Sequence, residues 1–125
     1  MEPIQETGKC YDQMAIMEKF ETVIEYLYPI IQSIPRKHGI TRDTVLEGLF
    51  TTVEVIYEAG KSNQVSKIYA VDARLALLRF HMRFLLRRKC MSPHQLKTAQ
   101  ALLAEVGKMV GAWVKKKRSQ GQTGS

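Results

Sequence analysis

Three arginines follow one another at intervals of one helical turn, and this spacing is the strongest chemical signal in the sequence. Arg79, Arg83 and Arg87 stand at positions i, i+4 and i+8, so a helix would place them on one face. A guanidinium group is planar and binds a phosphate or a carboxylate through two parallel hydrogen bonds. Within this segment, Asp72 is the one acid on their side. The arginine stripe (Arg79, Arg83 and Arg87) therefore predicts a site for phosphate groups.

The arginine stripe has a second interpretation, in which it forms salt bridges. Glu18, Glu21 and Glu25, or glutamates of the second helix of a neighbouring subunit, would then pair with it. Other basic residues lie on the opposite side of the same helix or in the turns. The full set of candidates for binding nucleic acid or a partner is Arg36, Lys37, Lys61, Lys67, Arg74, Arg79, Arg83, Arg87 and Arg88.

The sequence offers little support for catalysis. His38, His81 and His94 share no spacing that suits a nucleophile or a metal site. His81 lies in the middle of a predicted helix, as in phosphotransfer domains, but it is flanked by arginines and lacks the small neighbour that would leave it accessible. The sequence contains no glycine-rich phosphate loop, no Cys/His cluster and no pair of carboxylates in an apolar setting. We therefore expect a protein that is not an enzyme and has no metal and no cofactor.

Charge is divided unequally between the two halves of the chain. Residues 1–60 contain ten acidic and five basic side chains, whereas residues 61–125 contain two acidic and fourteen basic ones, which gives a net charge of +7. A basic half of this kind favours a polyanionic partner, because binding releases counterions and the field steers association. Improved solubility, or pairing with acidic faces of the same fold, would also explain it.

The chain divides into elements that are all predicted to be helical. Apolar residues recur at steps of three and four, and the predicted helices span residues 11–34, 41–60, 64–89 and 92–114. Thr41 is the predicted N-cap of the second helix, and Gly60 is expected to adopt the left-handed conformation at its end. Ser92 and Gln95 form a capping box, with Pro93 in the first helical position. Gly107 and Gly111 indicate the close approach of another helix.

Long helices with short connections predict an all-α fold, an up-down-up-down antiparallel four-helix bundle. The bundle is expected to occupy residues 11–114. Residues 1–10 are expected to be a flexible N-terminus, and residues 115–125, which begin with Lys115-Lys116-Lys117-Arg118, a basic, disordered C-terminal tail.

The third predicted helix has two apolar seams. Its first seam comprises Val71, Leu75, Leu78, Met82 and Leu85, and its second comprises Ala73, Leu77, Phe80 and Phe84. A surface helix of a monomeric bundle needs one such seam. The second seam predicts a homo-oligomer with Leu77, Phe80 and Phe84 in its interface. Alternatively, it is the far edge of one wide buried face.

The sequence contains no signal peptide and no apolar run long enough to span a membrane. Cys10 and Cys90 have no metal spacing and are expected to be free thiols in a reducing cytosol. We therefore expect a cytoplasmic protein. Binding to a membrane surface through Lys115–Arg118 is disfavoured, because bulky apolar neighbours are few there.

Four stretches resemble a known family: residues 26–39 (YLYPIIQSIPRKHG), 60–67 (GKSNQVSK), 77–80 (LLRF) and 92–95 (SPHQ). The sequence from Lys9 to Trp113 resembles the accessory variability determinant protein, Avd, of diversity-generating retroelements, and is most similar to the phage version. More distantly it resembles the four-helix proteins encoded by intervening sequences of bacterial ribosomal RNA genes. The likeness rests on its extent, since no short catalytic signature is involved.

The resemblance implies a specific function. Avd proteins are basic four-helix bundles that assemble as barrel-shaped pentamers, bind nucleic acid and associate with the reverse transcriptase of the retroelement. They are required for the template-primed, adenine-mutagenised cDNA synthesis that diversifies a target gene in the bacterial host. Arg79 and Arg83 match the basic surface of the family, whereas the segment Arg87-Arg88-Lys89-Cys90 departs from the family pattern. The competing interpretation is a protein-only adaptor or signalling bundle whose basic face binds an acidic protein.

Overall fold

The computed structural model of the chain describes residues 11–62 and 64–124, and this part is helical throughout apart from short turns. Its α-helices are α2 (Tyr11–Gln32), α3 (Gly39–Lys61), α4 (Val65–Arg87) and α5 (Pro93–Gly124), and a 3-10 turn, η1 (Arg36–His38), precedes α3. No strand occurs among these described residues. The predicted all-α class is confirmed. The predicted flexible segment 1–10 lies outside the described residues.

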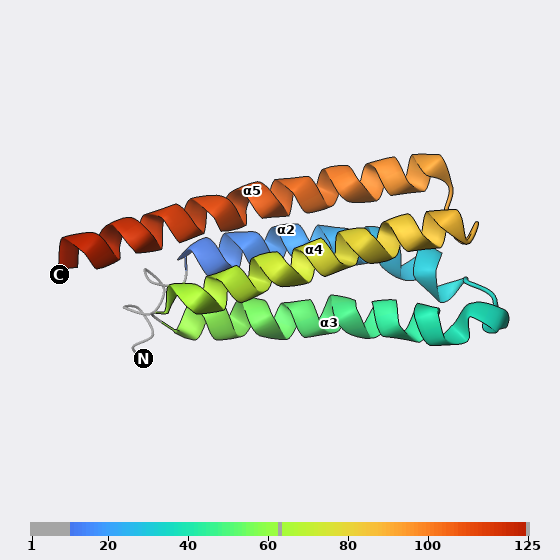
Figure 1. Ribbon diagram of the computed structural model, residues 1–125, viewed down its shortest axis with the longest axis horizontal. Coiled ribbons are helices and arrows are strands. Elements are labelled where there is room, and N and C mark those ends of the chain that lie inside the picture. Colours follow the sequence, from blue (N-terminus) through green and yellow to red (C-terminus); the bar gives the residue numbers. More distant parts are fainter. Residues whose placement is uncertain (1–10, 63, 125) are drawn as a thin grey trace.

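The four helices lie side by side, and each packs mainly against two others. α2 contacts α3 and α5, and α4 contacts the same two helices, so the pairs α2/α4 and α3/α5 lie diagonally across the core. Figure 1 shows each helix running back along the one before it. The α3–α4 connection and the end of α5 therefore lie at one end of the bundle, and the α2–α3 and α4–α5 connections lie at the other.

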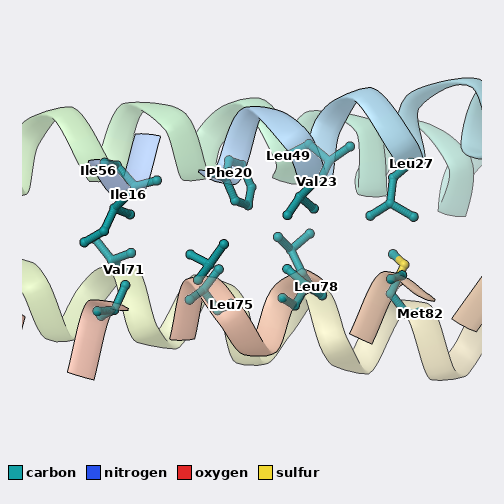
Figure 2. Packing of buried hydrophobic residues seen from close by; sticks show 14 of the residues in the cluster. Ile16, Phe20, Val23, Leu27, Leu49, Ile56, Val71, Leu75, Leu78 and Met82 are labelled. Atoms are coloured by element: carbon teal, nitrogen blue, oxygen red, sulfur yellow. The ribbon is translucent and has the colours of Figure 1, made fainter. Parts of the chain in front are cut away.

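The core is built from one apolar seam of each helix (Figure 2). The first seam of α4 is buried as expected, and on α5 the residues Ala99, Leu103, Val106, Val110 and Trp113 are buried. On α2, Ile31 is fully buried, whereas Ile30 is half-buried. On α3, the buried residues are Val45, Gly48, Leu49, Thr52, Ile56 and Ala59. Thr52 is tolerated there because its hydroxyl donates a hydrogen bond to the Gly48 carbonyl at 2.7 Å.

The predicted N-cap of α3 was three residues too late. α3 begins at Gly39, with His38 as the N-cap, and Thr41 lies within the first turn. The 3-10 turn of Arg36–His38 leads directly into the helix, and its last amide, that of His38, already donates to the Pro35 carbonyl at 2.9 Å. The chain is therefore helical before Thr41 could serve as a cap.

The predicted left-handed conformation at Gly60 was also wrong. Gly60 lies inside α3, and no glycine of the described chain has a positive φ. A Cβ atom at this position would lie 2.5 Å from Cγ of Gln13, a buried residue of α2. The glycine is therefore needed here because it lets α2 approach α3 closely, and not because the backbone adopts a special conformation.

In the connection between α4 and α5, backbone groups at the end of α4 and at the start of α5 form hydrogen bonds. Lys89 has a φ of 62°, and the amides of Lys89 and Cys90 donate to the carbonyls of Leu86 and Leu85 at 2.9 and 2.8 Å. This pattern is a Schellman motif with lysine in the position that glycine usually occupies.

The next helix, α5, starts with the predicted capping box, which is confirmed. The Ser92 amide donates to Oε1 of Gln95, and the Gln95 amide donates to Oγ of Ser92, each at 3.0 Å.

The C-terminal segment differs from the predicted disordered tail. α5 continues past Val114 to Gly124, and its basic residues contact the starts of two other helices. Nζ of Lys116 lies 3.0 Å from Oδ2 of Asp12, and Nη1 of Arg118 donates to the Tyr69 hydroxyl at 3.2 Å. These contacts give Lys116 and Arg118 partners on other helices, which the sequence pattern did not reveal. None of the described helices is both long enough and apolar enough to span a membrane.

Replacing Ser92 with alanine should lower the free energy of unfolding by about 1 kcal/mol, because the amide of Gln95 loses its acceptor. Urea denaturation measures the change. The control is Ser66→Ala, at an exposed position in the first turn of α4. An equal loss in both variants would contradict a capping role for Ser92.

Candidate nucleic-acid interface

The arginine stripe lies on one side of α4. The direction in which the stripe points is set by the first seam of α4, which is buried in the core. Leu75, Leu78 and Met82 are fully buried in the core. Arg79 is half-buried, whereas Arg83 and Arg87 are exposed. Because the three arginines share one face of a helix held on its buried side, their guanidinium groups are presented from a rigid support.

Arg79 lies against α5. A Cβ atom at Gly107 would lie 2.8 Å from Nη2 of Arg79, so the guanidinium occupies the space that a side chain would need. The predicted close approach of another helix at Gly107 is not confirmed, because the group beside this glycine is the end of a side chain of α4 and not a helix backbone. Nothing lies within 4 Å of a Cβ atom at Gly111, so the same prediction was wrong for that residue.

The arginine stripe has no carboxylate partner within the described residues. The ion pairs there join Lys19 to Glu105, Arg42 to Asp43 and Lys116 to Asp12, and none involves the stripe. Glu105 is one of the two acids in the basic half, but Lys19 of α2 binds it at 2.9 Å. This hydrogen bond and the charge of Lys19 lower the pKa of Glu105. The described part of the chain therefore does not neutralise the stripe.

At the Arg87 end of the arginine stripe, two guanidinium groups lie close to the aromatic ring of Phe84. The guanidinium carbons of Arg87 and Arg88 lie 5.9 and 5.7 Å from the centroid of the Phe84 ring. Phe84 in turn stacks with Phe80, with the ring centroids 6.2 Å apart. α4 ends at Arg87, and Arg88 is the first residue of the turn, so both guanidinium groups share the ring of Phe84.

Arg74 and His81 face α3, away from Arg79. Nη2 of Arg74 lies 3.6 Å from a Cβ atom at Gly48, and Nε of Arg74 is buried without a hydrogen-bond partner in the described chain. Nδ1 of His81 is buried in the same way, and the residue lines a hollow of about 190 Å³. Burial lowers the pKa of His81, and the charge of Arg74 lowers it further. The imidazole is therefore held neutral near pH 7 and supplies no cation to a phosphate site.

The remaining candidates divide between the two ends of the bundle. Lys61 and Lys67 lie at the α3–α4 connection, at the end where α5 terminates. Arg36 and Lys37 lie in η1, at the same end as Arg88 (Figure 1). Eight of the nine predicted residues therefore form the arginine stripe and two terminal groups, and Arg74 lies apart from them on the side that faces α3.

The second seam of α4 is not the edge of a buried face within one subunit. Leu77 and Phe80 are 39% and 43% exposed, and Phe84 is half-buried. Ile40, Thr41 and Thr44 of α3 line the hollow beside the two phenylalanine rings. Ile40 is 86% exposed and was missed in the sequence, because it lies outside the regular stripe of its helix.

The sequence model of the bAvd-like family matches residues 14–117, which include the seams of all four helices and the arginine stripe. This chain belongs to the bAvd-like family. The resemblance drawn from the sequence is confirmed, and the family consists of accessory, non-catalytic proteins. No curated protein matches the chain.

Metal-ligating side chains do not cluster in the part of this bAvd-like chain that the structure describes. Among the residues that the structure describes, no three His, Cys, Asp or Glu side chains lie close enough to hold a metal ion. Cys90 is a free thiol, and Cys10 lies outside the described residues. The basic surface is thus the main chemical feature of the site.

Replacing Gly111 with alanine should raise the free energy of unfolding by about 0.5–1 kcal/mol, because alanine is the better helix former and the position is open. Gly107→Ala should gain less, since its new methyl group displaces the guanidinium of Arg79. Urea denaturation of both variants provides the comparison. Equal gains would show that Arg79 does not rest on Gly107 in solution.

The free energy of unfolding should decrease as the pH falls below about 6.5, because the unfolded chain binds the His81 proton more tightly than the folded chain. The contribution of His81 is fully present above this pH and is lost as the pH falls through the lowered pKa of the folded state. Urea denaturation of the wild type and His81→Gln between about pH 8 and about pH 5.5 tests this. Identical pH profiles would contradict it.

Proposed function

We propose that this chain is a non-catalytic accessory protein of a diversity-generating retroelement. The arginine stripe binds RNA or DNA, and the protein associates with the element's reverse transcriptase to support mutagenic cDNA synthesis and retrohoming in the cytoplasm of a bacterial host. The observation that carries this proposal is the absence, in the described chain, of any carboxylate paired with Arg79, Arg83 or Arg87. Membership of the bAvd-like family supports it.

Nucleic-acid binding follows from the physical character of the stripe. Guanidinium groups at one-turn intervals on a rigid helix present several phosphate ligands at once. Arg36 and Lys37 at one end of the bundle, and Lys61 and Lys67 at the other, would extend the contact along a phosphate backbone. Phosphate contacts carry no sequence information, so binding should be largely independent of sequence.

Self-association would multiply these contacts. We propose that Leu77, Phe80 and Phe84 are covered by another copy of the up-down-up-down bundle, in a closed assembly that is a pentamer in the Avd pattern. The exposure of Leu77 and Phe80 supports an interface at this seam. A ring places several stripes within reach of one polyanion, so individually weak contacts add through effective concentration.

Replacing Arg79, Arg83 and Arg87 together with alanine should weaken binding to mixed-sequence duplex DNA. The log–log slope of affinity against salt should become shallower by about 2.7 per bound subunit, since each neutralised phosphate contributes about 0.9. Fluorescence anisotropy across a salt series measures both affinity and slope. The matched control removes the same charge from α5 by replacing Lys97, Lys108 and Lys115 with alanine.

The control variant should retain most of the affinity if the stripe is the principal contact. Circular dichroism and light scattering must show an intact fold and an unchanged assembly in both variants. If the stripe variant unfolds or changes its assembly size, the arginines form salt bridges between subunits. If only an acidic protein binds, and nucleic acid does not compete with it, the protein is an adaptor.

A further inference from the structure

A second surface, on the α2–α3 side of the bundle, carries an aromatic pair that the subunit leaves uncovered. The rings of Tyr28 and Phe50 meet edge to face, with centroids 6.2 Å apart and an interplanar angle of 72°. Together with Ile40 and Leu46 they line an open hollow of about 490 Å³. Tyr28 is 36% exposed and Phe50 is 48% exposed. Apolar side chains gathered at the surface in this way typically mark a contact with another molecule.

Two carboxylates line the same hollow. Asp43 and Glu47 lie one turn apart on α3, and both are exposed. Glu47 forms no ion pair with any described residue, whereas Asp43 accepts a hydrogen bond from Nε of Arg42 at 3.0 Å. The Asp43 side chain is 70% exposed, so this pair is weak and solvated and leaves the carboxylate open to a second cation.

Arg42 and the basic turn Arg36–His38 border the hollow at one end of the bundle, whereas the rest of the surrounding surface is acidic. No lysine or arginine occurs on α2 after Lys19, or on α3 between Arg42 and Lys61. These two cation-free segments contain further exposed glutamates, namely Glu21, Glu25, Glu54 and Glu58. Between the cations that border the hollow and Lys19 or Lys61, the glutamates make the field over α2 and α3 negative, so this surface favours a cationic ligand over a nucleic acid. The charge thus indicates what kind of partner covers the hollow.

We propose that the hollow between α2 and α3 binds a basic segment of a protein partner, seating an arginine or lysine side chain between the aromatic pair and the two carboxylates. An arginine fits this combination well, since its guanidinium stacks on an aromatic face and also donates two hydrogen bonds to a carboxylate. Ile40 and Leu46 cover the aliphatic stem of the inserted side chain. This surface does not depend on nucleic-acid binding, so it goes beyond the function proposed above.

With these two surfaces, the protein would connect a nucleic acid to a basic protein. The arginine stripe on α4 would bind an anionic polymer. The hollow, which lies on a different side of the same bundle, would bind a cationic peptide. A basic peptide and a nucleic acid attract each other in solution, and the protein would hold them apart at fixed positions. The hollow is therefore a docking site for the protein component of such a complex.

A fluorescein-labelled peptide of alternating arginine and glycine serves as the probe, with binding to the full chain followed by fluorescence anisotropy at physiological ionic strength. The double variant Asp43→Asn/Glu47→Gln should weaken binding by about three- to tenfold, and Phe50→Ala by about two- to fivefold, as expected for exposed ion pairs and cation–π contacts. The matched control is Glu54→Gln/Glu58→Gln, which removes the same charge from the same helix outside the hollow. It should change the affinity by less than about twofold.

Two results would overturn the proposal. Equal weakening by the two double variants would mean that the peptide responds to the general field and not to the hollow. A changed assembly size of Asp43→Asn/Glu47→Gln or Phe50→Ala in light scattering would mean that another copy of the chain covers the hollow. Duplex DNA affinity should be unchanged or increased in these variants, so failure here is distinguishable from failure of the nucleic-acid proposal.

Discussion

Burial of the first seam of α4 is the constraint from which the surface of this protein follows. Val71, Leu75, Leu78, Met82 and Leu85 are all removed from water. Turning the helix to expose them would cost on the order of 10 kcal/mol, which is comparable with the whole stability of a domain of this size. The rotation of α4 is therefore fixed. It directs Arg79 toward α5, Arg74 and His81 toward α3, and Leu77 and Phe80 outward.

The distribution of charge makes the two sides of the bundle chemically different. α2 and α3 carry most of the acids, and α4 and α5 carry most of the bases. Two of the ion pairs among the described residues, Lys19–Glu105 and Lys116–Asp12, cross the boundary between α2 and α5. Such exposed pairs add little stability. The apolar core holds the fold, and most surface charges remain available to partners.

Features set within one helix could be predicted from the sequence, and features set between helices could not. The seams of α4 and α5 and the capping box at Ser92 depend on the spacing of neighbouring residues, so their pattern is visible in the chain. The contact of Gln13 with Gly60, the position of Arg118 beside Tyr69 and the pairing of Tyr28 with Phe50 depend on how far one helix slides along another. The arginine stripe was correctly placed on one helical face, but its lack of carboxylates became evident only with the neighbouring helices in position.

The lysine in the Schellman motif has a consequence for how the protein balances stability against charge. A left-handed backbone at a residue with a side chain costs about 1–2 kcal/mol, and glycine would remove most of that strain. The chain instead has Lys89 there, directly after Arg87 and Arg88. The end of α4 and the connection to α5 therefore contain three consecutive cationic residues, although the backbone conformation of Lys89 is unfavourable for a residue with a side chain. A glycine would make the joint more stable and less basic, so this corner of the bundle has a higher density of positive charge at the expense of some stability.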